Sequence, residues 1–308
     1  MVETKGLTQR FGQTVALDRL DLQMQPGVTG LVGANGAGKT TLLSAMLGLR
    51  TPTAGSLTVL GIDPQQAGHR LRAMIGFAPE RNVLPDEMRA VDFVRHMAEV
   101  QGIPRSEART RASDTLWLVG LGEERLRTLG TMSTGQRQRV KLAQAIASDP
   151  KLVLLDEPTD GLDPVQRSEM LNLISQISKS FSIDVVLSSH QLEEVERVCD
   201  NVVALDAGRL VACGLISELV GAGDGITLEL VDLADPPGSV DAVESALAAA
   251  GLEVRREAAV LAVRGAEFAE LCDHARDSVA AAGARIRRLE ARRRTLEDLF
   301  DGSAADSR

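Results

Sequence analysis

The stretch Gly33-Ala-Asn-Gly-Ala-Gly38-Lys39-Thr40-Thr41 is the most informative part of this 308-residue chain. It fits the P-loop pattern, and it stands directly between an apolar segment at 29–32 and another at 39–48. In such a strand–loop–helix unit, the backbone N–H groups of the loop hold phosphates at the positive end of the helix. Lys39 is expected to reach the β- and γ-phosphates, and the Thr40 hydroxyl to bind Mg²⁺. The stretch therefore predicts a site for a nucleoside triphosphate.

A pair of acidic residues, Asp156 and Glu157, follows the apolar segment 152–155. A strand that is buried on both faces is continuously apolar, so these acids are expected at its carboxyl end, where ligands bind in open α/β sheets. Asp156 is then placed to hold Mg²⁺ through water, and Glu157 to accept a proton from an attacking water. A helix cap is the alternative for an isolated Asp-Glu pair. A P-loop on the same sheet favours the catalytic interpretation.

Three further motifs complete the pattern. Met132-Ser-Thr-Gly-Gln136, here called the signature, ends twenty residues before Asp156. Pro158-Thr-Asp-Gly-Leu-Asp163, here called the D-loop, follows the acidic pair, and His190 follows the apolar segment 185–189. In this order the motifs resemble those of the ATP-binding cassette (ABC) ATPases, and the resemblance covers residues 2–220. It implies an α/β fold, a P-loop NTPase cassette with a mixed sheet core and a helical insertion.

The resemblance also implies a mechanism. Two cassettes, either two copies of this chain or this chain and a paralogue, would pair head to tail, with each ATP between one P-loop and the signature of the partner. Glu157 would be the general base, His190 would contact the γ-phosphate, and Asp163 would couple the two sites. The catalytic group would consist of Glu157, His190 and Lys39, and the Mg²⁺ ligands would be Thr40, Glu80 and Asp156. The residues expected at the nucleotide are Phe11, Gly33, Asn35, Gly36, Ala37, Gly38, Lys39, Thr40, Thr41, Ser133, Gly135, Gln136 and Asp163.

Three positions depart from the family pattern. The chain has no Tyr, so the expected adenine-stacking ring is Phe11, which keeps the aromatic face; a strand-end core residue is the alternative. Glu80 stands where the family carries Gln, which adds a possible Mg²⁺ ligand but also negative charge near the γ-phosphate. The signature has Met132 and Thr134 in place of Leu and Gly, whereas Ser133, Gly135 and Gln136 are intact.

Composition narrows the possible partners. The net charge of −9 disfavours binding to nucleic acid, which requires a basic face, and six Phe with a single Trp leave few rings for stacking bases. No uncharged apolar run approaches the ~18 residues needed to cross a bilayer, and the N-terminus lacks a signal-peptide pattern. Three scattered cysteines do not form a disulfide or zinc framework. These features predict a soluble chain.

Two domains are expected. Residues 1–220 would form the cassette, with the helical insertion at about 87–150, and the glycine-rich break at 221–225 would mark the boundary. Residues 221–308 alternate strand and helix in the order of a small α+β domain of the split βαβ kind. Within the cassette, strands are expected at 29–32, 57–60, 75–78, 152–155, 185–188 and 202–205, and helices at 39–48, 136–148, 165–180 and 191–198.

The leading functional expectation is the motor subunit of a type 2 ABC exporter for antibiotics, lipids, polysaccharides or ions. It would bind ATP and Mg²⁺ on the cytoplasmic side of the membrane, as a peripheral partner of a transmembrane permease. The single cassette, the C-terminal extension and the ending Thr295-Leu-Glu-Asp-Leu-Phe300 carry this resemblance. A soluble ABC ATPase acting on the ribosome or on nucleic acid is the alternative. A nucleotide-binding regulator with little turnover is disfavoured by the intact Glu157 and His190.

Overall fold

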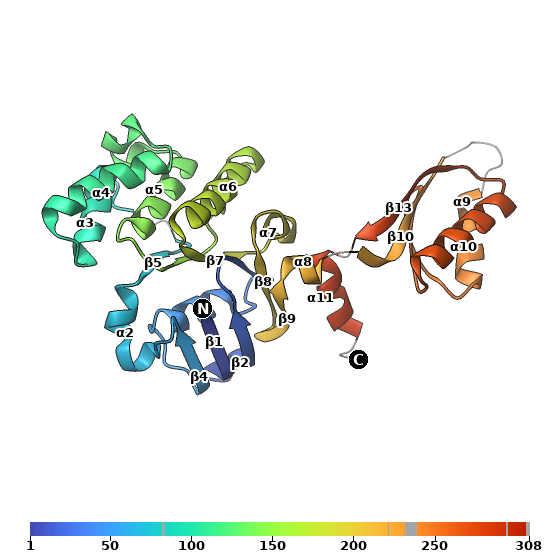
Figure 1. Cartoon of the computed structure of the whole chain (residues 1–308), viewed down its shortest axis with the longest axis horizontal. Coiled ribbons are helices and arrows are strands. Elements are labelled where there is room, and N and C mark those ends of the chain that lie inside the picture. The colour runs from blue at the N-terminus through green and yellow to red at the C-terminus, as the bar shows by residue number, and fades with distance from the viewer. Residues whose placement is uncertain (82–83, 221, 232–238, 294, 306–308) are drawn as a thin grey trace. The chain divides into compact units, whose positions relative to one another are not determined.

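The computed structural model describes residues 1–81, 84–220, 222–231, 239–293 and 295–305, and it separates into two compact units (Figure 1). Unit 1 comprises Met1–Ile216 together with Leu299–Arg308, and unit 2 comprises Ser217–Asp298. The division thus falls a few residues before the glycine-rich segment at 221–225. Gly221 lies outside the described residues, and the rest of that segment belongs to a strand that begins at Ala222. Among the described residues, none of the helices combines the length and the apolar character that crossing a bilayer requires.

Unit 1 is built around a six-stranded sheet with the order β5-β6-β7-β3-β8-β9. The first five strands are parallel, and β9 is antiparallel to β8, so the sheet is mixed as the sequence predicts. Helix α6 connects β6 to β7, helix α7 connects β7 to β8, and helix α1 follows β3. The bounds are β3 (Val28–Val32), α1 (Lys39–Met46), β5 (Ile75–Ala78), β6 (Leu152–Leu155), α6 (Pro164–Phe181), β7 (Asp184–Ser189), α7 (Leu192–Val198), β8 (Asn201–Asp206) and β9 (Arg209–Leu215).

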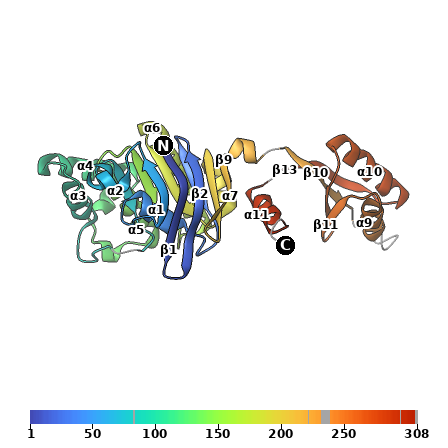
Figure 2. The ribbon, with the colours of Figure 1, turned by 90° about the horizontal axis from the view of Figure 1, so that it is seen from below.

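A second, three-stranded antiparallel sheet has the order β2-β1-β4. Its strands β1 and β2 were not among the expected elements. Its strands are β1 (Val2–Phe11), β2 (Thr14–Met24) and β4 (Ala54–Val59), followed by the short helix α2 (Pro64–Arg72). Figure 2 shows β1 and β2 side by side. The fully buried side chains of Leu7, Leu20, Leu42 and Leu43 share one hydrophobic core, so helix α1 after the P-loop is packed between the two sheets.

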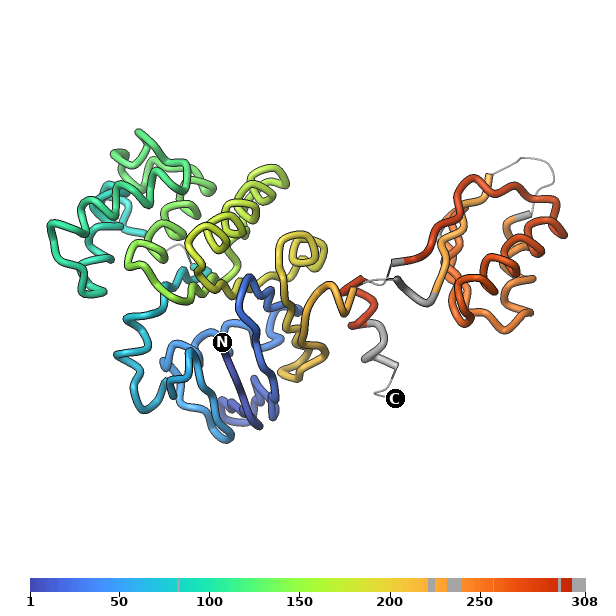
Figure 3. The backbone as a smooth tube through the Cα atoms, in the orientation of Figure 1, coloured from blue at the N-terminus to red at the C-terminus, as the bar shows by residue number. Residues whose placement is uncertain are grey.

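The predicted insertion is mainly helical, and Figure 3 traces it in green. Val94, Ala98, Ala112 and Leu116 are fully buried or nearly so, which shows that the insertion has an apolar core. The helix α5 carries the signature at its N-terminus and returns the chain to the sheet. The elements are α3 (Ala90–Val100), α4 (Arg105–Leu118), the 3-10 turns η1 (Glu123–Leu126) and η2 (Leu129–Thr131), and α5 (Thr134–Ile146).

Unit 2 is a four-stranded antiparallel sheet, order β11-β12-β10-β13, with two helices packed on one face. The chain order strand–helix–strand–strand–helix–strand is that of a split βαβ domain. The short helices α8 and α11 flank it in sequence, and α11 was not expected. The bounds are α8 (Ile216–Leu219), β10 (Ala222–Leu230), α9 (Ser239–Ala249), β11 (Glu253–Glu257), β12 (Val260–Arg264), α10 (Phe268–Ala281), β13 (Ile286–Arg293) and α11 (Leu296–Ala305).

Gly76 shows how closely α5 approaches the sheet. A Cβ atom built on Gly76 would lie 1.8 Å from the backbone oxygen of Ala145, which cannot rotate away. We predict that Gly76→Ala lowers the free energy of unfolding by about 1–3 kcal/mol, as overpacking does. Gly68→Ala is the control, because its Cβ would meet only the mobile end of the Arg72 side chain at 2.8 Å. Urea unfolding of both variants tests this; equal effects would contradict the packing argument.

Candidate functional site

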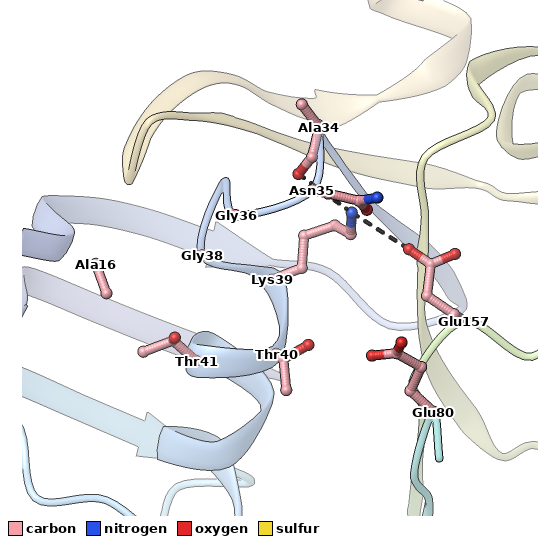
Figure 4. A pocket seen from close by; sticks show the side chains of 10 residues that line it. All are labelled: Ala16, Ala34, Asn35, Gly36, Gly38, Lys39, Thr40, Thr41, Glu80 and Glu157. Carbon is pink, nitrogen blue, oxygen red and sulfur yellow. Dashed lines mark hydrogen bonds and ion pairs between the residues drawn. The ribbon is translucent and has the colours of Figure 1, made fainter. Parts of the chain in front are cut away.

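The P-loop forms one wall of a pocket of about 320 Å³ at the carboxyl end of β3 (Figure 4). Lys39 is buried, and its Nζ donates to the Gly33 carbonyl oxygen at 2.8 Å. Gly38 has φ +106°, and a Cβ there would lie 2.6 Å from the Ala16 backbone oxygen, so the loop requires glycine at this position. The pocket is lined by Ala16, Ala34, Asn35, Gly36, Gly38, Lys39, Thr40, Thr41, Glu80 and Glu157.

The acidic pair emerges from the end of β6, two strands away from the P-loop strand in the same sheet. Ser188, on β7 between them, donates to Asp156 Oδ1 at 2.8 Å and accepts from the Glu157 N–H at 2.8 Å. Glu157 adopts φ +47°, a left-handed backbone conformation that is unfavourable for residues other than glycine. The turn thus aims the Glu157 carboxylate at the pocket, and the buried Ser188 hydroxyl holds the turn in place.

Glu157 lies between the two other residues expected in catalysis. Its Oε1 is 3.2 Å from Lys39 Nζ, and its Oε2 is 3.0 Å from His190 Nδ1. The Lys39 and Glu157 side chains are only 7% and 11% exposed, so this ion pair is shielded from water, whereas His190 is 45% exposed. The structure therefore brings the predicted base, the predicted phosphate lysine and the predicted γ-phosphate contact together at one point.

Two of the three predicted Mg²⁺ ligands, Thr40 and Glu80, line this pocket, and the third, Asp156, is hydrogen-bonded to Thr40. Thr40 Oγ1 donates to Asp156 Oδ1 at 3.3 Å, and the Glu80 carboxylate points toward Thr40 in Figure 4. Hydroxyl and carboxylate oxygens suit Mg²⁺, which usually keeps waters and substrate phosphates beside one or two carboxylates. Within the part of the chain that the structure describes, no group of three or more His, Cys, Asp or Glu side chains could hold a metal alone. The donor set fits a Mg²⁺ ion that arrives with a phosphate ligand.

The signature lies away from this pocket: none of the described residues that line the pocket belongs to it. Ser133 is the N-cap of α5, and it forms a reciprocal capping box with Gln136, with N–H to side-chain oxygen distances of 3.1 and 3.3 Å. Asp163 likewise caps α6, accepting from the N–H groups of Val165 and Gln166. Both residue sets thus stand at helix N-termini, where an anion is favoured.

Phe11, at the end of β1, is 42% exposed and is not among the described residues that line the P-loop pocket. The Arg50 guanidinium lies over its ring, 5.2 Å from the centroid. A ring this exposed is not a packed core residue, which disfavours the alternative reading of Phe11. Stacking of adenine on the remaining ring surface stays a prediction.

Sequence reasoning missed three side chains that organise the site. Ser188 and Arg167 were not singled out, although Ser188 lies in the apolar strand before His190. Arg167 on α6 donates to the D-loop carbonyl of Leu162 at 3.1 Å and to Gln191 Oε1 at 2.6 Å, and it pairs with Glu194 at 3.2 Å. Lys141 is buried on α5. The feature of the sequence that could have pointed to Lys141 is the rarity of lysine, because only five of the 34 basic residues are lysines.

Comparison with known proteins places these motifs in context. The sequence model of a family described as ABC transporter matches residues 17–160. Methionine import ATP-binding protein MetN of Xanthomonas oryzae pv. oryzae is 37% identical over 228 residues, which cover 71% of this chain and 68% of that protein. The MetN of Corynebacterium efficiens is 35% identical over 228 residues, which cover 71% of this chain and 64% of that protein. The chain thus spans roughly two thirds of the length of the curated relatives it matches.

A solved structure agrees with the sequence comparison. The cbiO1 protein from Clostridium perfringens, described as part of the ABC transporter complex cbiONQ, superposes with a TM-score of 0.65 at 28% identity. The match covers 70% of this chain and 89% of that protein. The expected cassette fold is therefore confirmed. The expectation of an exporter is wrong by this comparison, because the two curated relatives are named for methionine import.

Ser188 offers a direct test of how the acidic turn is held. Ser188→Ala removes two 2.8 Å hydrogen bonds and leaves the Glu157 N–H buried without its acceptor. We predict a loss of about 2–4 kcal/mol in the free energy of unfolding. Ser189→Ala, which removes a single bond from the Gln191 N–H at 3.0 Å, is the control and should lose about 0.5–1.5 kcal/mol. Denaturant unfolding measures both; a Ser188 variant as stable as the wild type would refute the role.

Proposed function

This chain belongs to the ABC transporter family, and from that premise we propose that it is the subunit that binds and hydrolyses ATP to power a transporter. The observation that carries the proposal is the meeting of Lys39, Glu157 and His190 at the P-loop pocket, beside Thr40 and Asp156. Each residue type suits one part of phosphoryl transfer to water. A pocket that only stored a nucleotide would not require a carboxylate and an imidazole at this point.

The hydrolytic step follows from this geometry. When ATP enters the pocket, Lys39 leaves Glu157 and binds the β- and γ-phosphates. The Glu157 carboxylate is then free to accept a hydrogen bond from water. Glu157 accepts a proton while the water oxygen bonds to the γ-phosphorus and the bond to the β-phosphate oxygen breaks. His190, at 3.0 Å from Glu157, is placed to orient the water and the γ-phosphate. Thr40, Asp156 and Glu80 are the residues that would hold a Mg²⁺ ion, which would supply positive charge to the phosphate groups.

Substituting the proposed base separates chemistry from binding. We expect Glu157→Gln to bind ATP and to lower turnover by ~10²–10⁴, because the amide cannot accept the proton. Lys39→Ala should instead lose nucleotide binding. Glu107→Gln, a substitution of the same kind on α4 where Glu107 pairs with Arg111, is the matched control and should keep the wild-type rate. Phosphate release and ATP binding are the two measurements. A Glu157→Gln enzyme with full turnover would remove Glu157 from the mechanism.

A second cassette completes the site in this proposal. The signature does not line the pocket of its own chain among the described residues, yet it presents an exposed helix N-terminus at Ser133. Placed against the P-loop pocket of a partner, that N-terminus would meet the γ-phosphate with favourable charge. The partner is a second copy of this chain or a paralogous cassette. Loss of the γ-phosphate removes the bridge and opens the pair, which is a ligand-biased two-state change.

We also propose that the chain works with a transmembrane partner. Because it would dock on that partner, we place the chain on the cytoplasmic side of the membrane. A groove of about 430 Å³ in unit 1 suits a short helix of such a partner, because its apolar side chains are left uncovered. Leu49 and Val100, at its rim, are 61% and 67% exposed. The groove is lined by Leu47, Leu49, His69, Arg72, Ala73, Ile75, Phe77, Met97, Val100 and Gln101.

Uptake is the direction that the relatives' names favour, since both curated relatives are methionine import proteins. The cargo itself would be contacted by the membrane subunit and not by this chain. Action on the ribosome or on nucleic acid is disfavoured by the net charge of −9.

A charge in the groove tests the membrane partner. We expect Val100→Asp to abolish co-purification with a multi-span membrane protein, because a carboxylate would be buried against its apolar helix. Leu126→Asp is the control, since Leu126 is 49% exposed and lies outside the groove. Both surface variants should unfold within about 0.5 kcal/mol of the wild type. Retention of the partner by Val100→Asp would show that this groove is not the docking site.

A further inference from the structure

One face of the signature helix α5 carries three buried polar side chains at intervals of three residues. Gln138 donates to the D-loop carbonyl of Asp160 at 3.2 Å, Lys141 to the Glu80 carbonyl at 3.1 Å, and Gln144 to the Phe77 carbonyl at 3.3 Å. The exposed fractions of the three donors are 3%, 3% and 6%. Helix periodicity puts residues three apart on the same face. The hydrogen bonds from Lys141 and Gln144 thereby connect the helix that starts at the signature to the segment that carries Glu80.

Lys141 differs from its two neighbours on this face because it brings a charge. Burial lowers the pKa of its ammonium to about 8, while Asp156, Asp160 and Glu80 act in the opposite direction and favour the protonated form. A buried charge persists only where opposite charges or hydrogen bonds compensate it. Two of these three carboxylates, Asp156 and Glu80, are the ones expected at Mg²⁺.

The position of Glu80 gives such a cation a possible function at the nucleotide site. Glu80 is exposed at the edge of the P-loop pocket, and it adds a second carboxylate to Asp156 at the end where the γ-phosphate would lie. Negative charges near the γ-phosphate oppose the binding of a triphosphate. A fixed positive charge behind the two carboxylates would reduce that repulsion, and it would do so more for ATP than for ADP, which lacks the γ-phosphate.

We propose that Lys141 is a positioning residue for the nucleotide site, whose buried ammonium offsets the charge of Glu80 and fixes its backbone to the signature helix. This rests on the proposed function, in that the P-loop pocket binds ATP. The two roles belong together: the carbonyl hydrogen bond holds the Glu80 segment at a set distance from α5, and the charge makes an acidic residue tolerable there. Gln144 makes the same kind of hydrogen bond to a carbonyl but carries no charge. Its substitution therefore tests the hydrogen-bonding role separately from the charge.

The experiment is a double-mutant cycle on nucleotide affinity. The wild type, Lys141→Met, Glu80→Gln and the combined variant are titrated with a non-hydrolysable ATP analogue and with ADP, both with Mg²⁺. We expect Lys141→Met to weaken the analogue about tenfold and ADP less than about threefold, because the lost charge acts mainly on the γ-phosphate. Adding Glu80→Gln to Lys141→Met should restore the analogue to within about threefold of the wild type.

Gln144→Met is the matched control: any weakening should be equal for the two nucleotides and unchanged by Glu80→Gln. If Lys141→Met does not fold, Lys141→Gln serves in its place, since an amide can still donate a hydrogen bond but carries no charge. Equal losses for the analogue and ADP, or no recovery with Glu80→Gln, would overturn the proposal and leave Lys141 a packing residue. A wild-type protein that binds neither nucleotide would overturn the proposed function, and this inference with it.

Discussion

The parallel pairing of β3, β6 and β7 is the constraint on which the site depends. Because parallel strands end at the same edge of a sheet, the P-loop after β3, the acidic pair after β6 and His190 after β7 arrive at one place from distant parts of the sequence. The ion pair between Lys39 and Glu157 forms across this edge, at 3.2 Å. A shift in the register of any of the three strands would separate these groups, which ties catalysis to the core of unit 1.

The helix α5 adds a second link between distant parts of the chain. Its N-terminus presents Ser133, while its buried face holds the D-loop through Gln138 and the Glu80 segment through Lys141. At Gly76 the backbone of β5 lies close against α5, since a Cβ there would be 1.8 Å from the Ala145 oxygen. The contacts that join the Glu80 segment to the signature helix are hydrogen bonds from buried side chains, and hydrogen bonds are stronger away from water.

The sequence sufficed for the features that are local. A P-loop, an acidic strand end and a helix cap are each specified by a few consecutive residues, so the candidate site residues that follow β3, β6 and β7 could be named in advance. The N-terminal sheet could not, because β1 and β2 are defined by pairing with each other and with β4 rather than by a strong pattern of their own. Lys141 was missed for a related reason: burial and neighbouring carboxylates, which give it significance, are properties of the fold.

The exporter expectation failed at a point that the structure explains. It rested partly on Thr295-Leu-Glu-Asp-Leu-Phe300, and three of these residues, Thr295, Leu296 and Asp298, have a local structural role in unit 2. Asp298 accepts from the Thr295 N–H at 3.0 Å, in the manner of a helix cap, and it pairs with both Arg264 and Arg292. Its side chain is only 7% exposed, and Leu296 is fully buried. Because capping and burial account for Thr295, Leu296 and Asp298, these residues would suit such a domain whatever the direction of transport.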